Sequence, residues 1–193
     1  MTTRLVWVEE TVRRMSSEID DLVNYSYGFD IKLLGVPETD PSGKEKAFET
    51  SNICVKIFKA MGARGLSIND IDIAHRVKSR NASATGPKPI ICKFVRRLAR
   101  NEVMALRKNI KNVNPLAVGL SPAIDLSKAL IVDHLPPRVQ KLFAEAKQFK
   151  STYNYGHCWT NGCNIYLRYD DVSKVIQVKD LGVIQDLEMA NES

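Results

Sequence analysis

The first apolar pattern along the chain has alternating spacings of three and four residues. Its members are Leu5, Val8, Val12, Met15, Ile19 and Leu22. This is the a/d seam of a coiled coil, and the positions around it are largely charged, as solvent-facing positions are. We therefore expect residues 1–26 to form a stalk helix that joins copies of the chain into a homo-oligomer. Because the seam is short, a helix that packs on the body of the same chain is the alternative.

Two other periodicities follow between residues 27 and 133. Short apolar stretches predict strands at residues 29–36, 71–77, 90–95 and 129–132. Helical spacing predicts one helix over residues 44–61, closed by Gly62, and a second that carries Ala99, Val103, Leu106 and Ile110. This order is that of the split βαβ fold, an antiparallel four-stranded sheet with two helices on one face and the first and third strands in the centre. RNA-recognition-motif (RRM) domains use the same plan.

Residues 134–193 have the pattern of a second, smaller domain. Pro136 and Pro137 stop the preceding strand, and Pro137 can begin a helix. A hairpin follows that helix, and residues 174–178 and 183–188 predict a third strand and a short helix. The chain is thus expected to be an α+β protein with an N-terminal helix, an RRM-like domain and a small C-terminal α+β domain.

The hairpin carries the most informative chemistry of the sequence. Asn161-Gly162 suits a type I′ turn, which would pair Thr160 with Cys163 and Tyr155 with Arg168. One face would then carry Cys158, Cys163, Ile165 and Leu167, and the other would carry Tyr155, His157, Trp159, Asn164, Tyr166 and Arg168. Aromatic rings beside a cation on a solvent face are what stacked bases and phosphates require. Ordinary surface aromatics are the alternative.

Basic charge supports the same function. The chain has 28 Lys and Arg against 22 Asp and Glu, a net charge of +6, which favours polyanionic partners. Basic residues cluster between Lys88 and Lys111, where Glu102 is the single acid, and residues 78–89 are expected to form an exposed basic loop. The candidate phosphate contacts are Lys32, Arg76, Lys93, Arg96, Arg97, Arg100, Arg107, Lys108 and Lys111. For each of them a solvated surface charge is the alternative.

Several classes of protein are disfavoured by what the sequence lacks. No stretch approaches the roughly 20 apolar residues of a membrane span, and no signal peptide pattern begins the chain. The four cysteines are scattered, and the predicted turn places His157 on the face opposite Cys158 and Cys163, which disfavours a zinc site. No nucleophile, phosphate-loop or metal-ligand motif is present. We therefore expect an intracellular protein without catalytic residues, metal, cofactor or membrane partner.

A series of short motifs, in order along nearly the whole chain, adds a family resemblance. They are residues 31–38, 73–77, 89–94, 133–137, 159–162 and 165–168. In this order the chain resembles the RNA-binding protein from the first open reading frame of LINE-type non-LTR retrotransposons, the transposase 22 family. The resemblance implies a coiled-coil oligomer whose RRM-like and C-terminal domains clamp single-stranded nucleic acid, with RNA contacts at Lys32, Lys93 and Arg107. It also implies nucleic-acid chaperone activity and packaging of retrotransposon RNA into a ribonucleoprotein, which we expect in the cytoplasm and also in the nucleus.

Together these patterns predict a binding protein for single-stranded RNA, and also DNA, with little sequence specificity. The cations of the four-stranded sheet and the rings of the hairpin are expected to meet the same strand. A protein–protein assembly module with an RRM-like fold is the alternative function.

Overall fold

The computed structural model describes residues 2–39, 45–78 and 86–192, and it is a mixed α+β protein. The chain divides into two compact units. One comprises Phe29–His134, and the other comprises Met1–Gly28 with Leu135–Ser193. Each unit is described by itself. Two internal segments lie outside the described residues. They are residues 40–44, which end at the start of the helix predicted over 44–61, and residues 79–85 of the predicted basic loop.

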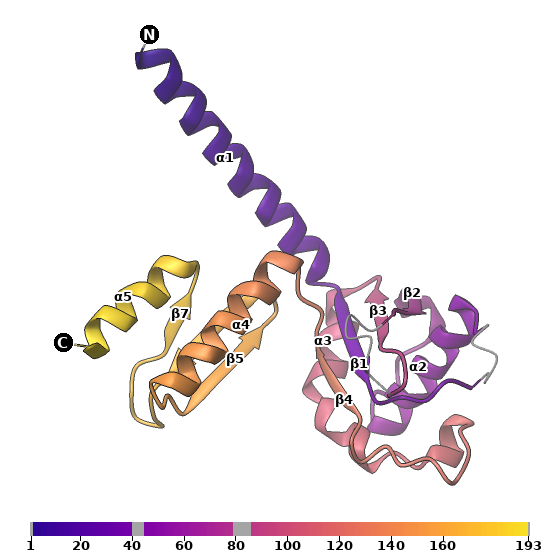
Figure 1. Cartoon of the computed structure of the whole chain (residues 1–193). Helices are drawn as coiled ribbons and strands as arrows, with labels where there is room; N and C mark the ends of the chain where they lie inside the picture. The colour runs from indigo at the N-terminus through magenta and orange to yellow at the C-terminus, as the bar shows by residue number, and fades with distance from the viewer. Residues whose placement is uncertain (1, 40–44, 79–85, 193) are drawn as a thin grey trace. The chain divides into compact units, whose positions relative to one another are not determined.

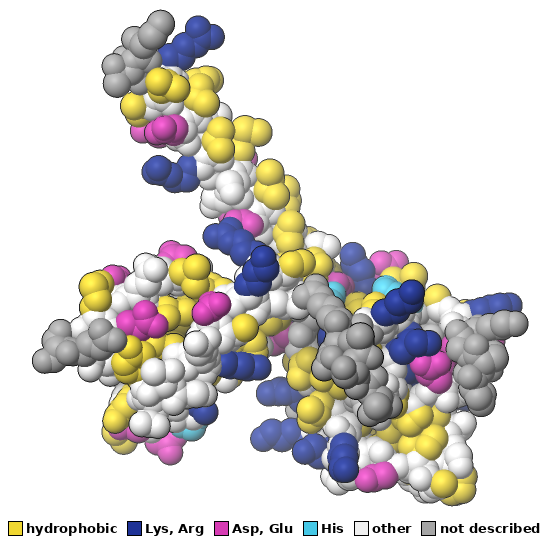
Figure 2. Space-filling model, in the orientation of Figure 1, with side chains coloured by type: hydrophobic (Ala, Val, Ile, Leu, Met, Phe, Trp, Pro, Cys, Tyr) yellow, Lys and Arg dark blue, Asp and Glu magenta, His cyan; other side chains and the backbone are white. Residues whose placement is uncertain are grey.

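The N-terminal helix is longer than its apolar seam. Helix α1 (Thr2–Tyr27) carries the seam on one side, where Figure 2 shows a row of yellow side chains. The exposed fraction of the seam residues ranges from 43% at Val8 to 70% at Leu22, so the folded chain leaves the seam uncovered. Near the end of the helix Asp20 forms an ion pair with Arg138. Within the described residues, no helix is both long enough and apolar enough to cross a membrane.

The unit Phe29–His134 has the predicted order of elements. Its strands are β1 (Asp30–Leu34), β2 (Ile71–Arg76), β3 (Ile90–Phe94) and β4 (Leu130–Asp133). Its helices are α2 (Ala47–Met61) and α3 (Arg97–Ala105), with 3-10 turns η1 (Ile68–Asp70), η2 (Arg107–Asn112) and η3 (Pro115–Val118). The sheet is antiparallel in the order β2-β3-β1-β4, which confirms that the first and third strands are central (Figure 1).

The core of this unit lies between the sheet and its helices. Ile31, Ile90 and Phe58 are fully buried there, and the rings of Phe58 and Phe94 lie 5.7 Å apart. Gly62 ends α2 as predicted: its φ of 118° is in the left-handed region, and its N–H donates to carbonyls of the last helical turn.

The second predicted helix is divided into two elements. Helix α3 ends at Ala105, and Ile110 reaches the core from the 3-10 turn η2 instead. The Asn109 side chain donates a hydrogen bond to the Met61 carbonyl at 3.0 Å, which ties η2 to the end of α2. The apolar spacing therefore identified the buried positions but not this change of helix type.

The C-terminal part of the other unit is a small sheet covered by helices. Its elements are α4 (Pro137–Thr152), β5 (His157–Asn161), β6 (Asn164–Arg168), β7 (Ile176–Val178) and α5 (Leu181–Glu192). The strands are antiparallel in the order β5-β6-β7, and α4 lies across β5 and β6 (Figure 1). Ile165 and Leu167 face α4 and are buried with Ala146 and Phe149.

The predicted register of the hairpin was wrong by two residues. Trp159 pairs with Tyr166 and Asn161 with Asn164, so the turn is Gly162-Cys163. Only Gly162 has a positive φ in this turn, 59°, which suits a type II′ turn rather than type I′. A slip of two residues preserves the alternation of side chains, so the polar and apolar faces of the strands are as expected, but Cys163 belongs to the turn.

Tyr155 does not belong to the exposed face that the sequence predicted. It precedes β5 and is 9% exposed, with its ring edge-on to Phe149 at 5.0 Å and to Tyr169 at 5.2 Å. The chain turns at Gly156, whose N–H donates to the Tyr169 carbonyl. This close approach of two backbones brings Tyr155 into the core and begins the strand at His157.

Asp30 is a buried carboxylate at the start of β1. It is 9% exposed, and its Oδ1 has no hydrogen-bond partner among the described residues. Burial raises its pKa from 3.8 to about 6, with an opposing effect of Lys93, which lies opposite it on β3. Folding therefore disfavours the charged form of this group.

Gly156→Ala is expected to destabilise the C-terminal sheet. The added methyl carbon would lie 2.8 Å from the Tyr169 carbonyl oxygen, so one of the two backbones must move. We expect the free energy of unfolding to fall by about 1 to 3 kcal/mol, measured by urea denaturation. Gly65→Ala is the matched control, since nothing lies near its added carbon. Equal stabilities of the two variants would contradict the close approach.

Asp30→Asn is expected to stabilise the protein only at a pH above the pKa that the Asp30 carboxyl has in the unfolded chain. Because the folded pKa is the higher one, the unfolded chain releases this proton more readily, and stability falls as the pH rises from about 4 to about 7. The variant should gain about 1 to 3 kcal/mol near pH 7.5 and almost nothing near pH 3, measured by denaturation at each pH. Asp125→Asn is the control. Hydrogen bonds from Ser127 lower the pKa of that carboxyl, so this variant should not gain stability as the pH rises. A gain for Asp30→Asn that does not depend on pH would contradict this account.

Candidate nucleic-acid interface

The exposed face of the β5–β6 hairpin brings four of the predicted side chains together. Trp159 lies opposite Tyr166, and His157 lies opposite Arg168 two pairs further along, on the same face. The Trp159 and Tyr166 rings stack, with centroids 5.6 Å apart and planes at 23°. Trp159 remains 37% exposed. The strand pairing thus holds two rings and two basic groups on one face without any loop.

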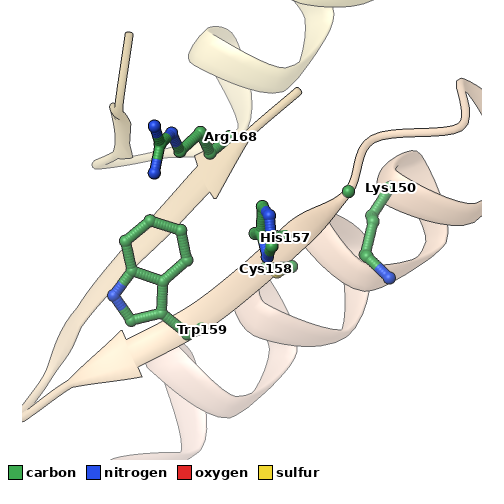
Figure 3. A pocket seen from close by; sticks show the side chains of 6 residues that line it. Lys150, His157, Cys158, Trp159 and Arg168 are labelled. Carbon is green, nitrogen blue, oxygen red and sulfur yellow. The ribbon is translucent and has the colours of Figure 1, made fainter. Parts of the chain in front are cut away.

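A shallow pocket lies at the edge of this face, along β5. It encloses about 410 Å³ and is lined by Lys150, Gly156, His157, Cys158, Trp159 and Arg168. Figure 3 shows Trp159 and His157 along β5, Arg168 on the neighbouring strand and Lys150 on the helix behind. Three basic side chains and an indole ring therefore border one hollow, which suits a phosphate beside a base.

The loop after β6 contacts both basic groups of the hairpin. His157 Nε2 lies 2.9 Å from Asp171 Oδ1, and Arg168 Nε donates to the Ser173 carbonyl at 2.9 Å. Asp170 accepts hydrogen bonds from Ser173 and from the Val172 N–H, and the bonds from Ser173 lower the pKa of its carboxyl. These bonds give the loop a defined turn that holds Asp171 beside His157.

Cys158 borders the pocket but has the character of a packed thiol. Burial raises its pKa, although Lys147 and Lys150 oppose that shift. A thiol with a raised pKa is a poor nucleophile at neutral pH. The pocket is therefore suited to binding rather than to covalent chemistry at this residue.

Two of the predicted cations lie on the open face of the four-stranded sheet. Lys32 on β1 and Lys93 on β3 are half-buried there, with Ile91 opposite Lys32. Their neighbours on the same face include Asp30 and the exposed apolar residue Val132. No aromatic side chain stands on these strands beside the lysines, so this face offers charge without a stacking ring.

Other predicted cations lie in the helical layer instead. Arg107, Lys108 and Lys111 are exposed on η2, which packs on α2 and β4 through Ile110. Figure 2 shows dark-blue side chains along the margin of the unit that carries α3 and the following turns. Lys93 on the sheet and Arg107 on η2 therefore stand on different layers of this unit.

Arg96 and Arg97, at the start of α3, each contact another side chain but remain exposed. Arg97 is exposed and stands over the Phe29 ring, 4.8 Å from its centroid. Arg96 donates from Nε to Asp70 at 3.0 Å, and this bond, with those from Ser67, lowers the pKa of Asp70. The Arg96 side chain is still 64% exposed, so the pairing does not remove it from the surface.

Arg76 is taken up entirely by the fold. Its side chain is 7% exposed and donates to Glu45 at 2.9 Å and to the Val36 and Pro37 carbonyls at 2.6 Å. Burial would raise the pKa of Glu45, but the hydrogen bonds from Arg76 and Thr50 more than offset this and lower it. Arg76 joins the start of α2 to the end of β1 and cannot reach a phosphate.

Arg100 is likewise a structural residue. It is 7% exposed and forms an ion pair with Asp133 on β4, and its Nε has no partner among the described residues. The single helix that the sequence predicted over this segment would place Arg100 and Arg107 on one face. The change from α3 to η2 separates them, and Arg100 points into the protein instead.

The sequence did not reveal two residues of the pocket region, Lys150 and Asp171. Lys150 borders the apolar stripe of α4, but only the packing of α4 across β5 brings it to the pocket. Asp171 stands in a polar loop with no distinctive spacing, and the turn around Asp170 carries it to His157. Neither placement has a periodic signal in the sequence.

Comparison with known proteins gives one family match. Residues 136–188 match the model of Baculovirus FP protein domain 2, and this range includes every residue that lines the pocket. A search of the curated proteins found no match. The family match points to a baculovirus family rather than to the LINE-type retrotransposon protein or the RRM family. The resemblance inferred from the order of motifs was therefore wrong, and RNA packaging and chaperone activity, which rested on it alone, lose their support.

Proposed function

We propose that this protein binds single-stranded nucleic acid with little sequence preference, chiefly through the exposed face of the β5–β6 hairpin. The observation that carries the proposal is the stacked Trp159–Tyr166 pair beside a pocket bordered by Lys150, His157 and Arg168. Every base has an aromatic face, so stacking on such rings tolerates any sequence. The phosphate beside a stacked base can then meet the basic groups.

The cations of the unit Phe29–His134 supply a second, purely electrostatic contribution. Arg107, Lys108 and Lys111 are exposed on η2, and each phosphate that they neutralise releases counterions. Arg76 and Arg100 are excluded from this set, because both are buried in ion pairs. The proposal therefore predicts that the affinity for single strands falls as the salt concentration rises. It also predicts that the contribution of base stacking to this affinity is the same at every salt concentration.

Two sets of substitutions separate these contributions. Trp159→Ala with Tyr166→Ala is expected to weaken binding of labelled single-stranded RNA, since stacking contributes about 1 to 3 kcal/mol per base, with little change in the salt dependence. Arg107→Ala should weaken binding and also reduce the slope of log affinity against log salt by up to about one unit. Fluorescence anisotropy titrations at several salt concentrations measure both quantities.

The control for the aromatic variant removes exposed rings elsewhere. Trp7 and Phe48 are 64% and 69% exposed, on α1 and α2 respectively, so Trp7→Ala with Phe48→Ala should leave the affinity unchanged. Unchanged affinity in the Trp159 and Tyr166 variant would refute the stacking role, and wild-type protein that fails to bind any single strand would refute the function.

Self-association through α1 is part of the proposal. The uncovered seam from Leu5 to Leu22 is suited to a second copy of the same helix, because burying it would remove an extended apolar stripe from water. Val12→Asp with Ile19→Asp is expected to convert an oligomer to a monomer, measured by sedimentation equilibrium. Glu10→Lys, outside the seam, is the control. A wild-type chain that is monomeric at high concentration would contradict this part of the proposal.

An assembly module is the second candidate function, and one observation favours it. The open face of the sheet exposes Ile73, Leu130 and Val132, with exposed fractions of 42%, 44% and 37%. An apolar sheet face of this kind suits a protein partner better than a polyanion. The binding titrations separate the two functions, because an assembly module would show little salt-dependent affinity for RNA.

A further inference from the structure

We propose that the Asp171 carboxylate occupies, in the free protein, the position at His157 that a phosphate takes in the complex. Binding of a phosphate at the β5 pocket would then exchange one anion for another. The inference rests on the proposed function, and it adds a named competitor and a phosphate position to it.

The first argument is the geometry at His157. Its Nε2 lies 2.9 Å from Asp171 Oδ1, while the same side chain lines the pocket with Lys150 and Arg168. A carboxylate oxygen at hydrogen-bond distance from an imidazole nitrogen marks a direction in which the N–H of that nitrogen can donate to an anionic partner. The oxygen of a phosphodiester has the same charge and the same accepting capacity.

The second argument is that the loop presents Asp171 without fixing its carboxylate. The turn is held by Asp170, through the Val172 and Ser173 N–H groups, and by the bond from Arg168 to the Ser173 carbonyl. The Asp171 side chain itself is 89% exposed. A polar contact so exposed contributes little to stability, so its replacement by a ligand costs little.

The third argument is the set of charges around the exchange position. Lys150 from α4 and Arg168 from β6 border the pocket, and only one N–H of the Arg168 guanidinium is used by Ser173. Asp171 contacts His157, one of the three basic side chains that line the pocket, while the neighbouring Asp170 accepts hydrogen bonds from Ser173. A phosphate between the three basic side chains would contact more donors than Asp171 does, which favours the exchange.

The experiment compares matched removals of one negative charge. Asp171→Ala is expected to bind a labelled single-stranded oligouridylate about two- to fivefold more tightly than the wild type, because the competing carboxylate is gone. Asp186→Ala is the control: it removes an exposed acid of α5 in the same unit and should change affinity much less. In a His157→Gln background the gain from Asp171→Ala should disappear.

A second probe separates this inference from the proposed function. Inorganic phosphate, titrated while the His157 ring signals are followed by NMR, should shift them at lower concentration in Asp171→Ala than in the wild type. Equal gains for the Asp171 and Asp186 variants, a gain that persists without His157, or identical phosphate titrations would each overturn the exchange. If phosphate shows the expected difference but no oligonucleotide binds, the exchange stands and the single-strand function fails.

Discussion

The antiparallel pairing of β5 with β6 is the constraint on which the candidate interface depends. Ile165 and Leu167 must face α4 to be buried, and the two-residue period of the strand then turns Tyr166 and Arg168 outward. The same period on β5 turns His157 and Trp159 to the same side. Burial of one face therefore decides which side chains point to the other face, where Trp159 stacks on Tyr166 and the loop after β6 contacts His157 and Arg168.

Pairing decides which basic residues can serve as ligands for an anion. Arg76 and Arg100 are as basic as Arg107, but each is buried against a carboxylate, Glu45 or Asp133, and breaking either pair would leave an uncompensated charge. The cations on η2 have no such role in the fold and stay in water. A net charge of +6 is thus a poor guide to the size of the basic surface, because part of the positive charge is structural.

The family match covers the part of the chain that carries the pocket. The matched range, residues 136–188, contains α4, the three-stranded sheet and the pocket along β5. The rest of the chain contributes the uncovered seam of α1 and the four-stranded sheet, whose open face has lysines without rings. The exposed rings of the hairpin and the exposed cations of η2 therefore belong to different units of the chain.

The sequence alone determined most of the elements and the two faces of the hairpin strands, because both follow from local periodicity. Spacings of three and four residues predicted α1, alternation predicted the strands and their order, and the same alternation placed Trp159 and Tyr166 on a face opposite Ile165 and Leu167. Only the tertiary structure decided the fates of Arg76, Arg100 and Tyr155, since burial and ion pairing depend on residues far away in the chain. It alone brought Lys150 and Asp171 to His157, because the packing of α4 on the sheet and the turn at Asp170 have no periodic signature. The register of the hairpin also needed the structure: Gly162 has a positive φ in either turn, and the sequence pattern does not decide whether it is the first or the second residue of that turn.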